Sequence, residues 1–467
     1  MVRKVRGLEN NILFKHFKRT KLFLLSILFL FFFKNTHSQI NDQFGNPFIK
    51  NFSKKQVKID LRTFDISQNK NGEMYFATSG SLLEFDGFRW VNYSLKEETD
   101  LRSVLYADDQ HIYTSGHGGF GYWSKNKKGI LDYSSLFFKH PSKTAPLLPV
   151  FSNIVAVDGK ILFQSFQQIH SYNPLTKKIN IITATKGFSA LFSSNNRAFV
   201  QDVSIGLFEI INSEQRIIKG TEDTSLDIIE VFEEDKKGLL IATKNNGFWH
   251  AKDGILRKKE WKINKEVENY IITDVKKYTE GNFIVGTLRN GFYIISKDGK
   301  KVAHFNKNNG IENNAIRNVF KDNNNNIWLA TESGISYAEV KSETKYLLDT
   351  KSNFGTVYTS FLNDSILYLG TNQGLFYKNI NKANSEPKLI DQSAEQIWEI
   401  DKIDNQILVG SNKGISLLEN NSLKTIHVEG GGWVFKTHPK INNLLYVGFY
   451  SGIAVFQKKN KQWKFLK

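Results

Sequence analysis

The sequence predicts an all-β protein, a β-propeller of about ten four-stranded blades. One unit recurs along the chain: a short apolar strand, a Thr or Ser, two or three polar residues, a Gly, and a second apolar strand. Gly238–Trp249, Asn326–Tyr337 and Ser365–Tyr377 are clear copies. The spacing between the marker glycines averages about 41 residues, and repeats of about 40–45 residues with four strands each are typical of propeller blades.

The marker glycines extend the repeat over most of the chain. A degenerate copy around Ile161–Ser165 has Gln168 in place of the Gly. Helical repeats of similar length are excluded, because the apolar runs are short, rich in β-branched and aromatic residues, and end at Asn or Gly. With the degenerate copy, the markers indicate ten blades. The marker glycines are Gly80, Gly119, Gly206, Gly247, Gly291, Gly334, Gly374, Gly414 and Gly452.

One unit illustrates the expected strands. From the innermost strand outward we expect Ile272–Val275, Phe283–Thr287, Phe292–Ile295 and Val302–Phe305. The last two strands are separated by Asp298-Gly299, and Asp-Gly suits the primed two-residue hairpin turn, which needs positive φ at both central residues. The same turn is expected in three other copies. These copies place Asp86-Gly87, Asp253-Gly254 and Asn420-Asn421 there.

The N-terminus predicts export. Residues 1–21 carry seven basic side chains and one acidic one, and Leu22–Phe33 follows without a charge. At 1.5 Å per residue, a helix of that length would measure about 18 Å, well short of the roughly 30 Å hydrocarbon core. We therefore expect a signal peptide over residues 1–38, cleaved near Ser38, and a periplasmic or secreted mature protein. An uncleaved segment that anchors the N-terminus in the membrane is the alternative.

The charge argues against a nucleic-acid partner. The net charge is +17, and it is +10 without residues 1–38, which hold eight basic residues and one acidic residue. Nucleic-acid binding requires basic residues gathered on one face. The lysines are instead scattered through turns such as Lys125–Lys128. The chain has no Cys, so disulfides make no contribution.

The repeat resembles the two-component regulator propeller repeat. That pattern is an Asn/Asp-Gly or Asn-Asn turn, Ile-Trp-Leu-Gly-Thr, two or three polar residues, and Gly-Leu; Asn326–Thr331 nearly matches it. The chain has no Trp-Asp pair, and its Gly-Gly doublets are irregular. Asn46–Phe52 and the end of the first blade, Leu82–Gly87, resemble the opening of the extracytoplasmic sensor half of Bacteroidetes regulators. The resemblance covers essentially the whole chain after residue 38.

The resemblance implies a sensor propeller that binds an extracellular ligand, a carbohydrate fragment, and acts on a membrane-bound kinase or regulator output domain that this chain lacks. Family members carry about two seven-bladed rings. This implies a first propeller of about seven blades at 45–345, and three further blades of an incomplete second propeller at 346–467. A single ten-bladed ring, a free-standing secreted binding scaffold and a homodimer are the alternatives left open.

The sequence gives little support for a catalytic or metal-binding site. The ten His are dispersed without a metal-binding spacing. Asp322–Asn326 begins like a calcium loop, but position 6 is Ile327 and position 12 is Ser333, so an Asn-rich turn explains it better. We expect no catalytic residue, metal or cofactor. A propeller lyase or glycosidase would need converging carboxylates or a His/Tyr base, and the candidate loops hold no acidic pair.

The predicted ligand site is the mouth of the first ring's channel. In a propeller, the loop joining the second and third strands lies on the same face as the start of the innermost strand, and loops are free to vary. Arg289 is the best candidate, because other copies place Asn, Lys or Glu in its turn. Turn geometry alone would also explain Asn residues there. The candidates in the first ring are His117, Asn153, Asn245, Asn246, Tyr270, Arg289, Asn290 and Asn314.

Each tryptophan could either pack in the core of a blade or provide a surface on which a ligand stacks. Trp90, Trp328 and Trp398 lie in or beside apolar strands, so we expect them in the blade core. Trp433 is different, because Gly430–Gly432 brings it to the start of an inner strand with bare backbone beside it. We therefore add Trp433 to the candidate ligand-binding residues.

Overall fold

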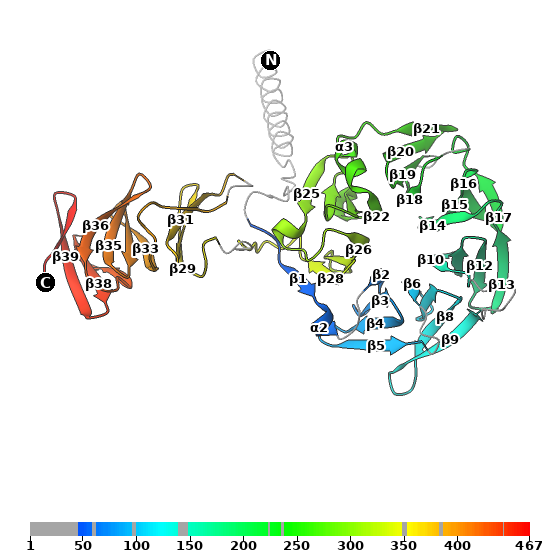
Figure 1. Cartoon of the computed structure of the whole chain (residues 1–467), viewed down its shortest axis with the longest axis horizontal. Coiled ribbons are helices and arrows are strands. Elements are labelled where there is room, and N and C mark those ends of the chain that lie inside the picture. Colours follow the sequence, from blue (N-terminus) through cyan, green and yellow to red (C-terminus); the bar gives the residue numbers. More distant parts are fainter. Residues whose placement is uncertain are drawn as a thin grey trace, which may run out of the picture. The chain divides into compact units, whose positions relative to one another are not determined.

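The computed structural model describes residues 45–57, 62–95, 100–138, 148–222, 225–234, 238–347, 353–382, 386–441 and 443–467. These residues form ten four-stranded sheets whose neighbouring strands are antiparallel (Figure 1). The predicted all-β fold with ten blades is confirmed. The predicted signal peptide lies outside the described residues. Within the described ranges, no helix has the length and apolar character needed to span a bilayer.

Seven of the sheets form a ring (Figure 1). Each innermost strand contacts the innermost strand of the next sheet, and the last of them contacts the first. The first four sheets run outward in chain order. They are β2 (Thr63–Gln68), β3 (Met74–Thr78), β4 (Ser81–Phe85), β5 (Trp90–Ser94); β6 (Leu101–Tyr106), β7 (Ile112–Gly116), β8 (Gly119–Lys125), β9 (Leu131–Phe138); β10 (Phe151–Val157), β11 (Lys160–Ser165), β12 (Gln168–Asn173), β13 (Lys178–Thr183); and β14 (Phe188–Ser194), β15 (Arg197–Asp202), β16 (Gly206–Ile211), β17 (Glu214–Ile217).

The remaining sheets of the ring include the unit whose strands were predicted individually. All four strands of that unit are found within two residues of the predicted bounds. The fifth to seventh sheets are β18 (Ile228–Glu233), β19 (Leu239–Thr243), β20 (Gly247–Lys252), β21 (Ile255–Lys258); β22 (Ile272–Lys277), β23 (Phe283–Thr287), β24 (Phe292–Ile295), β25 (Lys301–Phe305); and β26 (Ile316–Lys321), β27 (Ile327–Thr331), β28 (Ile335–Ala338) with β1 (Ile49–Phe52).

Three further sheets follow the ring along the chain. Their innermost strands also contact one another in series. They are β29 (Val357–Asn363), β30 (Ile366–Thr371), β31 (Leu375–Asn379), β32 (Lys388–Leu389); β33 (Ile397–Ile403), β34 (Gln406–Ser411), β35 (Gly414–Glu419), β36 (Ser422–Val428); and β37 (Val434–Thr437), β38 (Leu444–Phe449), β39 (Gly452–Lys459), β40 (Gln462–Phe465).

Helix is confined, in the described part of the chain, to single turns between strands. These are α2 (Lys54–Val57), α3 (Asn264–Val267), η1 (Glu268–Tyr270), η2 (Thr279–Gly281) and η3 (Lys307–Asn309). The core lies between the sheets, since β3, β7, β19, β23 and β27 are buried at every residue. A strand covered on both faces by neighbouring blades needs a continuous apolar run, which is why the second strand of each repeat is its most apolar segment.

The ring closes through β1, the first described strand. β1 pairs antiparallel with β28, with Ile49 opposite Ala338 and Phe52 opposite Ile335, so a strand from the start of the chain is the outermost strand of the last blade. Without β1, the edge of β28 would present unpaired backbone groups. Phe52 is 4% exposed and packs against Phe85, Trp90 and Trp328, with ring centroids 5.0–5.8 Å away.

The repeated Thr or Ser stabilises the turn between the second and third strands by a side-chain hydrogen bond. Its hydroxyl donates to a backbone carbonyl at or beside the marker position, and these hydroxyl-bearing residues are buried. This explains the pairing of Thr/Ser with Gly in the sequence, and it includes the degenerate copy. The bonds are Thr78 to Ser81 (2.8 Å), Ser165 to Gln168 (3.0 Å), Thr243 to Gly247 (2.7 Å), Thr287 to Gly291 (2.8 Å), Thr331 to Gly334 (2.9 Å) and Thr371 to Gly374 (3.0 Å).

The predicted primed hairpin turns are confirmed at two places and wrong at two others. Both central residues have positive φ in Asp253-Gly254 (50° and 76°) and in Asn420-Asn421 (51° and 57°). In Asp86-Gly87 and Asp298-Gly299 only the glycine has a positive φ. The hairpin loops there are longer: the N–H of Asp86 donates to the carbonyl of Arg89, and that of Ser296 to the carbonyl of Lys300. A longer loop no longer requires two left-handed residues.

Replacing Phe52 by Ala should destabilise the closed ring. The substitution removes a buried ring from an aromatic cluster at the closure, and such a change costs about 3–5 kcal/mol of unfolding free energy. Chemical denaturation measures the loss. The matched control is Phe88→Ala, because Phe88 is 89% exposed; it should change stability by less than about 0.5 kcal/mol. Equal effects of the two substitutions would contradict a role for Phe52 in the closure.

Candidate ligand-binding channel

A bulge in each innermost strand of the ring supplies the residues that face the channel. The register shifts after the first residue of every one of these strands, so one extra residue per blade stands outside the ladder. Bulges re-aim side chains and are common beside functional sites. Six of the seven extra residues line a channel of about 670 Å³. They are Phe64, Arg102, Ser152, Ile229, Thr273 and Arg317.

Two arginines flank one aromatic ring in this channel. The guanidinium carbon of Arg102 is 4.2 Å from the centroid of Phe64, and that of Arg317 is 5.4 Å from it. A cation over an aromatic face is attracted by the ring quadrupole. Arg102 Nη2 is 3.3 Å from Asp100 Oδ2, and Arg317 Nε donates to Glu332 at 2.6 Å. Arg102 Nε is buried and has no partner among the described residues.

Four charged side chains lie along the inner strands of the same channel. Lys276 Nζ is 2.8 Å from Glu230 Oε2 and 3.2 Å from Asp274 Oδ1. Asp65 accepts from Ser103 Oγ at 2.6 Å and from the N–H of Val104 at 3.0 Å. Two carboxylates therefore share one ammonium group, and Asp65 is held by a hydroxyl and a backbone N–H instead.

Burial and ion pairing shift the pKa values of these four groups in opposite directions. Burial raises the pKa of Asp65, Glu230 and Asp274, and the ammonium of Lys276 only partly offsets this. Burial alone would lower the pKa of Lys276, but Asp274 and Glu230 outweigh it, so the pKa of Lys276 is raised. Lys276 therefore stays charged and holds the carboxylates in place.

The chemistry of the channel suits binding. Glu230 and Asp274 are both engaged by Lys276, and Asp65 is engaged by hydroxyl, amide and backbone donors. A general acid or base must instead be able to reach the proton it transfers. Among the described residues, no group of three or more His, Asp and Glu is placed to hold a metal ion.

Of the residues predicted from the sequence, one lines this channel and a second contacts one of its arginines. Asn153 lines it from β10, next to Ser152. His117 follows β7; its Nε2 is 3.2 Å from Arg102 Nη2, and its N–H donates to the carbonyl of Asp100. The structure therefore brings His117 to one of the two arginines.

Four predicted residues meet in a separate loop cluster. The carbonyl of Tyr270 accepts from the N–H of Leu288, next to the exposed Arg289. Asn290 Nδ2 donates to the Tyr293 hydroxyl at 2.7 Å. The carbonyl of Asn314 accepts from the N–H of Gly291, and its side chain accepts from the N–H of Lys307 at 2.8 Å. Asn290 and Asn314 thus stabilise turns, while the Arg289 side chain is free to reach solvent.

The remaining loop candidates are Asn245 and Asn246, both exposed between β19 and β20. The N–H of Asn246 donates to Thr243 Oγ1, and its carbonyl accepts from Trp249 Nε1. Neither residue lines the described channel. Their role as ligand-binding residues stays a prediction, as it does for the other candidates.

Trp433 lies in an aromatic stack on the three further sheets. Its ring is 4.2 Å from that of Trp398, with an interplanar angle of 17°, and Trp398 is 4.8 Å from Tyr358 at 23°. Trp433 is 42% exposed and Tyr358 is 44% exposed. The prediction that Trp398 belongs to the blade core is therefore wrong, because it is half-buried in this stack. Trp328 is buried in the core, and Trp90, which is partly buried, packs against it.

Most channel residues were not predicted, because they lie on strands and the predicted candidates lie mainly in loops. A signal was present in the strands: Arg102 and Arg317 each follow the first residue of an inner strand, and Asp65, Glu230 and Asp274 each stand two places after the first residue of theirs. Charged residues at fixed places in otherwise apolar strands point to a shared polar surface.

Replacing Lys276 by Met should destabilise the protein in a pH-dependent way. The variant leaves Glu230 and Asp274 without their cation, which should cost about 1–3 kcal/mol at pH 7, less than for a fully buried pair because solvent in an open channel screens charge. The pKa of each carboxyl is already raised in the folded protein and should rise further. Ionisation then disfavours folding above the folded-state pKa, and the penalty should fade as the pH drops toward the ordinary values of 3.8 and 4.5.

Denaturation curves of the parent and Lys276→Met from neutral pH down to about pH 4 measure this difference. Lys178→Met, at an exposed position on the outer strand β13, is the control and should match the parent throughout. A Lys276→Met deficit that stays constant or grows as the pH falls would contradict the charge balance.

Comparison with known proteins agrees with the repeat read from the sequence. A family model described as Two component regulator propeller matches residues 310–333. This stretch contains β26 and β27, including the Asn326–Thr331 segment. No curated protein matches the chain.

Solved structures share the fold at low sequence identity. The extracellular domain of a proposed hybrid two-component system from B. thetaiotaomicron has a TM-score of 0.61 and 16% identity, over 89% of this chain and 60% of that one. The extracellular domain of a proposed one-component system from the same organism has a TM-score of 0.49 and 15% identity, over 90% and 61%. Virginiamycin B lyase from Staphylococcus aureus has a TM-score of 0.44 and 11% identity, over 62% and 98%.

These likenesses concern the fold, and the chain spans about 60% of the length of the first of these structures. The matched segment confirms the resemblance predicted from the sequence: residues 310–333 carry the two component regulator propeller repeat.

Proposed function

We propose that this chain is the extracytoplasmic ligand-binding propeller of a signal-transduction regulator, and that its ligand is a carbohydrate fragment. The observation that carries the proposal is a closed ring whose channel presents two arginines around Phe64. Arg can pair with a carboxylate through two parallel N–H donors, and the aromatic ring offers an apolar surface between them. The similar extracellular domains from two-component and one-component systems support a sensor role.

The partner in this proposal is a membrane-bound kinase or regulator output domain. A propeller changes little inside its blades, so a signal would pass through a change in how domains pack. The three further sheets are, in this proposal, the start of a second propeller at 346–467, after a first at 45–345. Ile453, on the last of these sheets, is 76% exposed, as expected for a blade with no further described sheet beside it.

The channel proposal predicts the effect of Arg102→Ala. Titration of the purified protein with neutral and uronate-containing oligosaccharides should identify a ligand, and Arg102→Ala should weaken its binding by about tenfold or more, because a charge-assisted hydrogen bond is lost. Arg257→Ala is the control, since Arg257 is exposed on the outer strand β21. A ligand that binds the parent and Arg102→Ala equally well lies outside the channel.

Arg289 gives a second, independent test of where the ligand lies. If the ligand sits over the loop cluster, Arg289→Ala should weaken its binding by about tenfold while Arg102→Ala leaves it unchanged. An affinity for Arg289→Ala within about twofold of the parent would make Arg289 a solvated turn residue.

Export is the part of the proposal that can be checked without a ligand. The mature protein from the native host should begin near Gln39, as N-terminal sequencing or intact mass would show. An intact Met1 on protein recovered from the cytoplasm would overturn both the periplasmic location and the sensor role.

A further inference from the structure

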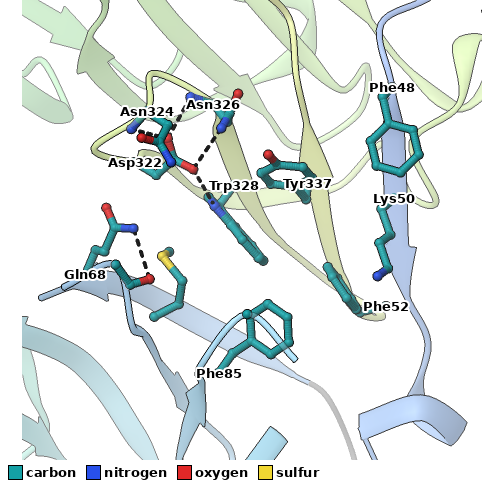
Figure 2. A pocket seen from close by; sticks show the side chains of 13 residues that line it. Phe48, Lys50, Phe52, Gln68, Phe85, Asp322, Asn324, Asn326, Trp328 and Tyr337 are labelled. Atoms are coloured by element: carbon teal, nitrogen blue, oxygen red, sulfur yellow. Dashed lines mark hydrogen bonds between the residues drawn. The ribbon is translucent and has the colours of Figure 1, made fainter. Parts of the chain in front are cut away.

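A second cavity lies at the closure of the ring, apart from the channel. It measures about 340 Å³ and is bounded by β1 and β28 on one side and by β3, β4 and the turn after β26 on the other (Figure 2). Phe48, Lys50 and Phe52 line it from one face of β1, since alternate residues of a strand point the same way. The cavity therefore exists only because β1 completes the last blade.

The walls of this cavity are aromatic. Trp328, Phe52 and Phe85 are 5%, 4% and 7% exposed and form its floor, and Tyr337 stands beside Trp328 with ring centroids 4.8 Å apart. Figure 2 shows the Trp328 and Tyr337 rings facing the space in front of β1. A cavity of this size with mostly apolar walls and a few polar groups suits a small ring-shaped ligand.

The lining of the cavity holds two charged side chains, Asp322 and Lys50. The Asp322 carboxylate already accepts from the N–H groups of Asn324 (2.9 Å) and Asn326 (2.7 Å) and from Trp328 Nε1 (3.2 Å). Lys50 Nζ lies 5.0 Å from the centroid of Phe52 and forms no ion pair with any described residue. An ammonium group offers three donors and no acceptor, so it favours an anionic group on a ligand.

We propose that this cavity binds a small molecule with one six-membered ring and one carboxylate, the ring lying against Trp328 and Tyr337 and the carboxylate pairing with Lys50. A sugar acid and an aromatic acid share this chemistry. A ligand held in this way contacts β1 and the blades on both sides of the closure. Binding should therefore stabilise the closure strand, independently of any ligand in the channel.

The test is a titration of the purified protein with two anionic probes, galacturonate and phenylacetate. Their neutral partners, galactose and phenylacetamide, are titrated in parallel. Calorimetry or ligand-observed NMR measures affinity. At least one anionic probe should bind at concentrations up to about 10 mM, and its neutral partner should bind about tenfold more weakly or not at all. The probe that binds tells the sugar acid from the aromatic acid.

Lys50→Met tests the assignment to this cavity. Met keeps an unbranched apolar side chain next to Phe52 and removes the charge, so the variant should fold and lose the preference for the anionic probe. Lys178→Met and Arg257→Ala, both at exposed positions on outer strands, should bind the probe like the parent. Amide hydrogen exchange in Ile49–Phe52 should slow when the probe is bound to the parent.

Two results would overturn the proposal: no binding of either anionic probe, or unchanged affinity in Lys50→Met. The second would place the probe outside this cavity. Failure here leaves the sensor proposal standing, because that proposal depends on Arg102 and Arg289, which do not line this cavity.

Discussion

The pairing of β1 with β28 is the constraint on which the ring depends. Blades of one kind can be stacked in any number, and contacts between neighbours alone do not fix where a stack ends. A ring is closed when the last blade contacts the first. Here β1, from the beginning of the chain, forms the outermost strand of the last blade. The channel, its two arginines and the cavity at the closure all exist only in the closed ring.

A second set of contacts closes the ring at the innermost strands of the same blades. Asp65 of β2 accepts from Asn318 of β26 on one side and from Ser103 and Val104 of β6 on the other. One carboxylate thus joins the last, first and second blades. Asp274 does the same between its own blade and the last one, accepting from the N–H of Val319 at 2.9 Å. Burial raises the pKa of both groups, so these bonds come with an electrostatic cost that Lys276 reduces.

The local features of the fold could be predicted from the sequence because each depends on residues close together in the chain. The four strands between Ile272 and Phe305 follow from apolar runs and turn residues, and the Thr/Ser–Gly pairing reflects a single hydroxyl bond. The turns at Asp86-Gly87 and Asp298-Gly299 were predicted wrongly, because the residue pair alone does not fix the length of the loop.

The site was harder to predict, because its residues come together only through the ring. Arg102 and Arg317 are far apart in sequence and share Phe64 only because the last blade contacts the first. The bulge that turns these residues toward the channel leaves no mark in the apolar pattern. Asn290 and Asn314 were predicted as binding residues from their chemistry, and each also makes a local side-chain hydrogen bond, with the Tyr293 hydroxyl and the N–H of Lys307, so their role in binding stays a prediction. Residue type alone does not tell an Asn that serves a turn from one that serves a ligand.

The two closures also suggest how a single blade junction can combine rigidity with binding. The inner closure is polar and short-ranged, made of carboxylate and amide bonds that fix the spacing of β2, β6 and β26. The outer closure is a four-residue strand on an aromatic cluster, and it leaves a cavity beside Trp328. Because the inner bonds hold the junction independently, β1 is the part of the ring whose stability a small ligand could change without opening the channel. The two proposed ligand sites, at the outer closure and in the channel, can therefore be tested separately on one scaffold.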